Sequence, residues 1–128
     1  MISCANTVLE QLERIDKEKF TDADLARLSQ MKGEALFWRG WAHQQLVAFF
    51  GEGYPCNGDG DKKGVPVRLQ VASTPDMLNI ERSTVAEVYD QILKDYEAAK
   101  LLLPAVWEER ADYPRPTSVA VASYIGQA

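Results

Sequence analysis

The chain has 128 residues, of which 46% are hydrophobic and 26% are charged, and these proportions predict one soluble globular domain with its own core. Nineteen acidic and fourteen basic residues give a net charge of −5, and no cluster of Lys and Arg exists to neutralise phosphates, so we expect no nucleic-acid partner. No apolar run is long enough to span a bilayer, and the residues after Met1 lack the basic and apolar regions of a secretion signal.

The chain contains no motif for a cofactor, a metal site or a catalytic centre. Its two cysteines, Cys4 and Cys56, lack the spacing of a metal site or a disulfide framework. His43 is the only histidine, and neither a metal site nor a Ser/His or Cys/His nucleophile can be assembled around it. We therefore expect no cofactor, no metal and no enzymatic activity, and a structural role for His43.

Two helices are predicted in the first 50 residues. The first is amphipathic, ends in the charged stretch 16–19, and has its apolar positions at Ala5, Val8, Leu9, Leu12 and Ile15. Residues 21–24 (TDAD) then resemble a capping box, which places the start of the second helix near Thr21. This helix is expected to end near Phe50, because glycines and a proline follow.

The second helix is too apolar on too many sides to be an ordinary surface helix, so the other helices are expected to pack around it. One face carries Leu28, Met31, Ala35, Trp38, Ala42, Leu46 and Phe49, and another flank carries Phe37, Trp41 and Ala48. Core packing is expected for these aromatic residues and for Phe50, and Glu34 falls on the narrow polar strip. Arg39 lies at the edge of the main apolar face, and because an unpaired buried guanidinium is costly, we expect carboxylates or carbonyls around its head.

The connection over residues 51–82 is rich in Gly, Pro, Asp and Asn and is long for a compact domain, which is typical of functional or disordered loops. Within it, residues 64–69 are compatible with a short extended segment. The spacing of Asn57, Asp59 and Asp61 superficially resembles a calcium loop. However, Lys62 stands where the glycine belongs and Arg68 where the bidentate glutamate belongs, so a turn of solvated acids is favoured.

Two more helices are predicted after the connection. Residues 84–87 (TVAE) form a capping box, an amphipathic helix follows, and Pro104 stops it. Residues 115–117 (RPT) are typical of another helix entry, followed by a small-residue helix over 119–128. Tyr96, Ala99 and Pro104 match the spacing of the second helix of a tetratricopeptide repeat (TPR). The sequence therefore predicts an all-α fold of antiparallel helices in divergent TPR-like packing with one long irregular loop.

Several short stretches, in this order, resemble the signatures of the SusD/RagB family. They are ANTVL at 5–9, KGEALFWRGWA at 32–42, LV at 46–47 before FG at 50–51, GVPV at 64–67, RSTVAEVYDQILKD at 82–95, LP at 103–104 and RPT at 115–117. No single motif is specific, but the ordered set covers almost the whole chain. The chain thus resembles part of a SusD/RagB-like domain over residues 1–128, with the loop 51–82 inside it.

The resemblance implies a non-catalytic lipoprotein on the surface of the outer membrane. Family members bind glycans, or in some cases peptides, and hand them to a TonB-dependent transporter of the SusC type. They are several times longer than this chain, which is expected to lack the lipoprotein signal and the later repeats, to be soluble, and to bind weakly alone. The other function class left open is a TPR-type scaffold that binds a peptide or protein partner.

Residues of the long loop are the candidates for ligand contacts, and the last helix is the candidate for self-association. Tyr54 offers a stacking face, and Asn57, Asp59 and Asp61 offer groups that pair with sugar hydroxyls. Trp107 and Tyr113 are further aromatic residues in loops, and each is expected either to contact a ligand or to cover the core. The last helix is expected to present an apolar face to a following helix or to a second copy of the chain in a homodimer. The alternative is that this helix frays. The apolar face carries Val119, Val121, Ala122 and Ile125.

Overall fold

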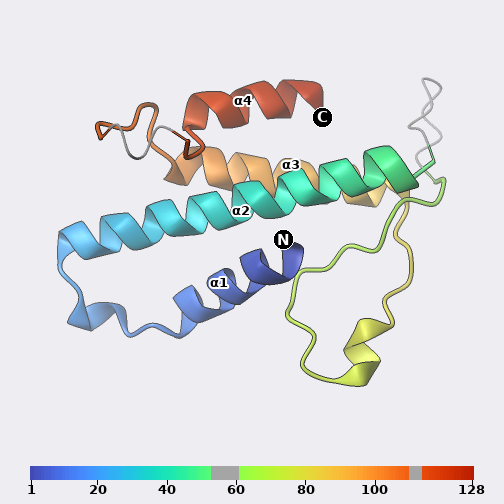
Figure 1. Cartoon of the computed structure of the whole chain (residues 1–128), viewed down its shortest axis with the longest axis horizontal. Helices are drawn as coiled ribbons and strands as arrows, with labels where there is room; N and C mark the ends of the chain where they lie inside the picture. Colours follow the sequence, from blue (N-terminus) through green and yellow to red (C-terminus); the bar gives the residue numbers. More distant parts are fainter. Residues whose placement is uncertain (53–60, 110–113) are drawn as a thin grey trace.

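The computed structural model describes residues 1–52, 61–109 and 114–128, and within these ranges the fold consists of four α-helices without a strand (Figure 1). The helices are α1 (Ile2–Arg14), α2 (Asp22–Phe50), α3 (Val85–Leu102) and α4 (Ser118–Gln127), with two 3₁₀ turns, η1 (Lys17–Lys19) and η2 (Pro75–Leu78). Successive helices run in opposite directions, α2 contacts both α1 and α3, and α4 contacts α3. The predicted all-α, antiparallel arrangement is confirmed.

Local side-chain chemistry starts the helices where the sequence predicted. At the start of α2, Thr21 and Asp24 form a reciprocal capping box, and Thr84 and Glu87 do the same at the start of α3. In the second box the Thr84 amide donates to a Glu87 carboxylate oxygen at 2.8 Å. Such caps satisfy amides that have no partner inside the helix. The Thr117 hydroxyl accepts from the amide of Ala120 and begins α4 in the same way.

Two glycines of α2 allow α3 to approach closely. A methyl group at Gly33 would lie 3.0 Å from side-chain atoms of Leu102 and Leu103, and one at Gly40 would lie 3.0 Å from the Tyr96 ring. Across this contact lie core residues of α3 that are fully buried. They are Val85, Val88, Ile92, Tyr96 and Ala99.

The expected burial of several α2 aromatics is wrong. Phe49 and Phe50 are 76% and 70% exposed, and Trp38 is 36% exposed. Phe37 is buried and Trp41 is partly buried against the core. The reason is that α2 packs mainly against α1 and α3, so apolar residues on its other sides, such as Phe49 and Phe50, remain in contact with water.

The prediction for α4 is also corrected. Val121 is fully buried and Ile125 packs against the same core, so these two residues face α3 instead of an absent partner. Val119 is 62% exposed and Ala122 is exposed as well. The four residues therefore do not form one outward apolar face for a homodimer. Within the described ranges, no helix has the length and apolar content that crossing a membrane requires.

Candidate functional site

The residues predicted to contact a ligand lie in the first part of the long connection. Tyr54, Asn57 and Asp59 fall outside the described residues. Asp61 is described, and its side chain is exposed. That these four residues form a ligand site stays a prediction.

The residues that flank this stretch are held together by hydrogen bonds. The amide of Glu52 donates to the carbonyl oxygen of Lys63 at 3.1 Å, and Lys63 forms a single bridge with Thr84 at the start of α3. The Arg82 guanidinium donates to the carbonyl oxygens of Lys63 at 3.2 Å and Phe50 at 3.4 Å. The described residues on the two sides of the predicted ligand stretch thus lie next to each other, at the end of α2 and the start of α3.

The later part of the connection, residues 66–80, lies across α1 and α2 and is held by their side chains. We call it the crossing segment. The Asn6 amide of α1 donates to the carbonyl oxygen of Arg68 at 3.1 Å. The amide of Arg68 donates to Nε2 of His43, a fully buried residue of α2, at 3.3 Å. His43 therefore has the structural role that the sequence indicated.

A buried ion pair connects three helices beneath this segment. The Arg39 guanidinium donates to both carboxylate oxygens of Asp95, from Nε at 2.9 Å and from Nη2 at 2.6 Å, and from Nη1 to the Asn6 oxygen at 3.1 Å. Gln91 adds a further hydrogen bond to Asp95 at 3.1 Å. In the described ranges no buried side-chain nitrogen or oxygen lacks a partner. Arg39 and Asp95 are 9% and 2% exposed, so this cluster joins α1, α2 and α3 in the interior of the fold.

A second charged contact joins α2 to the entry of α4. The Arg115 guanidinium donates to Glu34, from Nε at 2.8 Å, and lies 3.9 Å above the Trp107 ring. Trp107 is buried, and its indole N–H donates to the carbonyl oxygen of Pro116 at 3.1 Å. Trp107 is therefore a lid on the core and not an open stacking surface. Tyr113, the other late loop aromatic, lies outside the described residues.

The residues that match the TPR spacing, Tyr96, Ala99 and Pro104, have structural roles in and just after α3. Tyr96 is fully buried, and its hydroxyl donates to the Gln44 amide oxygen at 2.5 Å. Burial raises the pKa of Tyr96 well above its ordinary value, so the phenol stays protonated. Ala99 is fully buried, and Pro104, just after α3, accepts a hydrogen bond from the amide of Ser118 at 2.9 Å.

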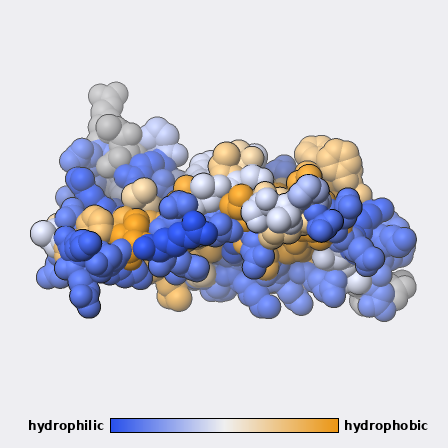
Figure 2. Space-filling model, turned by 90° about the horizontal axis from the view of Figure 1, so that it is seen from below, coloured by the Kyte–Doolittle hydropathy of each residue, from blue (hydrophilic) through white to orange (hydrophobic). Residues whose placement is uncertain are grey.

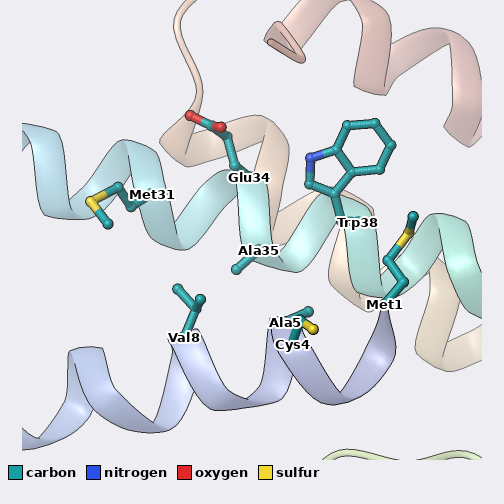
Figure 3. A pocket seen from close by; sticks show the side chains of 8 residues that line it. All are labelled: Met1, Cys4, Ala5, Val8, Met31, Glu34, Ala35 and Trp38. Atoms are coloured by element: carbon teal, nitrogen blue, oxygen red, sulfur yellow. The ribbon is translucent and has the colours of Figure 1, made fainter.

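An apolar groove of about 450 Å³ lies between α1 and α2 (Figure 3). Its lining residues are Met1, Cys4, Ala5, Val8, Met31, Glu34, Ala35 and Trp38. In Figure 3, Val8 of α1 and Ala35 of α2 point toward each other, whereas Glu34 and Trp38 point away from α1. Cys4 is an exposed free thiol, and Cys56 lies outside the described residues. The groove has few polar groups to orient a sugar.

A second hollow, of about 600 Å³, has a more polar lining and is bordered by α1, α2 and the crossing segment. Seen from below in Figure 2, the molecule is mostly hydrophilic, and hydrophobic residues gather in a band along the middle of this face. The polar groups of the hollow include Glu10, Glu13, Arg14, Lys32 and Gln70. Sequence patterns did not indicate it, since its walls come from three separate parts of the chain.

Trp38→Ala is expected to lower the free energy of unfolding by about 1–2 kcal/mol, because only part of this side chain leaves water on folding. The ring makes edge-on contacts with Phe37 and Trp41, at centroid distances of 5.0 and 5.8 Å, and is 36% exposed. Urea unfolding followed by circular dichroism measures the change. A loss above about 3 kcal/mol would mean that Trp38 is buried as the sequence pattern predicted.

The chain matches, over residues 1–127, the SusD-like family described as "Starch-binding associating with outer membrane". It is similar to a SusD-like carbohydrate-binding protein from Bacteroides vulgatus ATCC 8482, with 25% identity, a TM-score of 0.77, and coverage of 98% of this chain and 25% of that chain. A SusD superfamily protein from Bacteroides thetaiotaomicron VPI-5482 shows 25% identity, a TM-score of 0.78 and the same coverage. No curated protein matches the chain.

A laminarin-binding SusD-like protein shares the fold at 18% identity and a TM-score of 0.75, covering 98% of this chain and 23% of that chain. The chain spans about a quarter of the length of each of these structures. The stretches that resemble SusD/RagB signatures hold the groups that join α2 to α3, namely Gly33, Arg39, Gly40 and Asp95. Because the family match extends over nearly the whole chain and the helices superpose on SusD-like structures, this chain belongs to the SusD-like family.

Proposed function

We propose that this protein is a non-catalytic part of a glycan-binding protein of the outer membrane, and that the full-length protein hands oligosaccharides to a SusC-like TonB-dependent transporter. The observation that carries the proposal is the family match over residues 1–127, whose description names starch binding and association with the outer membrane. Two solved structures at 25% identity are named as a SusD-like carbohydrate-binding protein and as a putative sugar-binding protein. Since the chain spans about a quarter of the first, binding and transport are properties of the longer protein.

Within this chain we propose that the sugar contacts lie at Tyr54, Asn57, Asp59 and Asp61. An aromatic ring can stack on the apolar face of a pyranose, and carboxylates and amides can accept or donate hydrogen bonds to hydroxyls. Two observations on the flanking residues support this assignment. Asp61 is exposed, and the Glu52–Lys63 and Arg82 hydrogen bonds give the stretch a common base. Phe50, which ends α2 at that base, adds an exposed aromatic ring.

Tyr54→Ala is expected to weaken retention of the protein in starch-containing native gels at least about tenfold, because a stacked aromatic is the largest apolar contact that a sugar can make there. Asp61→Ala is expected to weaken it less. Glu97→Ala is the matched control, since Glu97 is an exposed carboxylate on α3 and its loss should leave retention unchanged. Melting temperatures of all three variants, measured in parallel, separate loss of binding from loss of folding.

Two outcomes would contradict these assignments. If the wild-type protein is retained but Tyr54→Ala and Asp61→Ala are retained equally, the sugar contacts lie elsewhere, and the polar hollow beside the crossing segment is the next region to substitute. If neither this chain nor the full-length protein is retained by starch or any other polysaccharide gel, glycan binding itself is wrong. Co-purification of the full-length protein with a SusC-like transporter tests the proposed transfer step.

A further inference from the structure

The hydrogen bonds of His43 define its tautomer. Nδ1 lies 3.0 Å from the carbonyl oxygen of Arg39, and a carbonyl oxygen can only accept, so Nδ1 carries the proton. Nε2 of a neutral ring then has a free lone pair, which accepts the amide hydrogen of Arg68 at 3.3 Å. The neutral imidazole thus joins α2 to the crossing segment, and a protonated one cannot do so because its Nε2 would be a second donor facing the Arg68 amide.

The charged groups that act on His43 are Asp95 of α3 and Arg39 of its own helix. Asp95 of α3 is already neutralised by the two hydrogen bonds from Arg39, so an imidazolium at position 43 would be a second cation beside one carboxylate. Burial lowers the pKa of His43 below its ordinary value of 6.5; Asp95 and the hydrogen bond to the Arg39 carbonyl oppose this effect, and the Arg39 charge adds to it. From α1, the neutral Asn6 amide and the carboxylate of Glu10 form hydrogen bonds with the crossing segment.

The crossing segment is attached more weakly than the helices are attached to one another. No residue between 66 and 80 is buried, Val67 packs against the core while only partly buried, and hydrogen bonds with Asn6, Glu10 and His43 hold the segment to α1 and α2. Besides the His43 bond, they run from Asn6 to the carbonyl oxygens of Arg68 and Gln70, at 3.1 and 3.4 Å, and from the Val71 amide to Glu10 at 2.8 Å. The Arg68 guanidinium donates a hydrogen bond within the segment, to the carbonyl oxygen of Met77 at 3.1 Å.

The residues at the two ends of the crossing segment are joined by backbone hydrogen bonds that do not involve His43. The amide of Gly64 donates to the carbonyl oxygen of Ser83 at 2.8 Å, and the amide of Val85 donates to that of Lys62 at 2.8 Å. These bonds allow residues 66–80 to leave the helices while α3 keeps its start and its packing. A region with few buried apolar contacts and exposed hydrogen bonds opens locally at a lower free energy than the core.

We propose that protonation of His43 releases the crossing segment from α1 and α2, so that the segment is an acid-sensitive element whose closed position requires the neutral imidazole. When the segment leaves, water reaches the ring and can hydrate the imidazolium, which the closed arrangement excludes. The sign follows from linkage. The open form binds a proton more readily than the closed form, so closing is favoured above the ordinary pKa of 6.5 and is lost progressively as the pH falls below it.

Amide hydrogen exchange of the chain, followed by NMR between about pH 7.5 and pH 5, tests this directly. After correction for intrinsic exchange, the protection of the Arg68 and Val71 amides is expected to fall together by about tenfold per pH unit below 6.5. The amides of Ile92 and Tyr96 in α3 are expected to keep their protection. A flat profile for Arg68, or a parallel loss in α3, would overturn the proposal.

Two variants identify the group that titrates. In His43→Gln an amide oxygen can accept from the Arg68 amide without titrating, so protection is expected to become independent of pH. Glu10→Gln removes the other titratable group that holds the segment and is expected to keep the wild-type slope. If the slope persists in His43→Gln or disappears in Glu10→Gln, the carboxylate and not the imidazole is responsible, and the proposal is wrong.

The wild-type chain provides a measurement that does not depend on whether a variant folds. His43 is the only histidine, so its ring ¹⁵N resonances are unambiguous. They are expected to show the neutral Nδ1–H tautomer near neutral pH and to report protonation over the same range in which Arg68 loses protection. A protonated ring beside a still protected Arg68 amide would contradict the mechanism.

Discussion

Asp95→Ala is expected to lower the free energy of unfolding by about 3–5 kcal/mol, because it leaves the largely buried Arg39 guanidinium without a counter-ion. Asp95 is 2% exposed and accepts both hydrogen bonds of the Arg39 pair, as well as one from Gln91. Urea unfolding of both proteins measures the difference. The effect is large because a buried, uncompensated charge costs more than the intact ion pair contributes.

The controls for this substitution come from the same helix and the same ion pair. Asp90→Ala removes an exposed carboxylate of α3 and is expected to change stability by less than about 0.5 kcal/mol. The double substitution Arg39→Met with Asp95→Leu removes both charges and is expected to be far less destabilising than Asp95→Ala alone. If Asp95→Ala costs less than about 1 kcal/mol, water reaches Arg39 and the ion pair is not buried.

Tyr96→Ala is expected to cost about 3–5 kcal/mol, because it empties a fully buried aromatic site between α2 and α4. The ring lies 5.8 Å from Phe37 and 6.1 Å from Tyr124, measured between centroids, and covers Gly40 of α2. Thermal and urea unfolding are the measurements. A small loss would show that neighbouring side chains refill the space.

Tyr96→Phe separates the ring from its hydroxyl. It keeps the packing and removes the hydrogen bond to Gln44, so a cost of about 1 kcal/mol is expected. Gly40→Ala provides a second check, since the added methyl would lie 3.0 Å from the Tyr96 ring. This substitution is expected to cost less in the Tyr96→Ala background than in the wild type. Equal costs would mean that the two residues do not determine the spacing of α2 and α3.

The sequence by itself determined the helices, their limits and the family. Capping boxes at Thr21 and Thr84 act over three residues, so they can be identified without knowing the fold, and both are formed in the structure. The apolar period of α3 correctly indicated its buried side, because one face of that helix is clearly more apolar than the others. The ordered SusD/RagB-like stretches indicated the family that the match over residues 1–127 confirms.

The tertiary structure alone decided which contacts these helices make. The apolar residues of α2 lie on several sides, and helical periodicity cannot say which of them a neighbour will cover, so Trp38, Phe49 and Phe50 were wrongly expected to be buried. The sequence showed that Arg39 needs a partner, but not that Asp95, 56 positions away, is that partner. The two bonds of His43 to Arg39 and Arg68 likewise exist only after α2 and the crossing segment come together. Interactions between residues that are distant in the sequence depend on how whole helices and loops pack. Local sequence patterns such as caps and helical periodicity do not determine that packing.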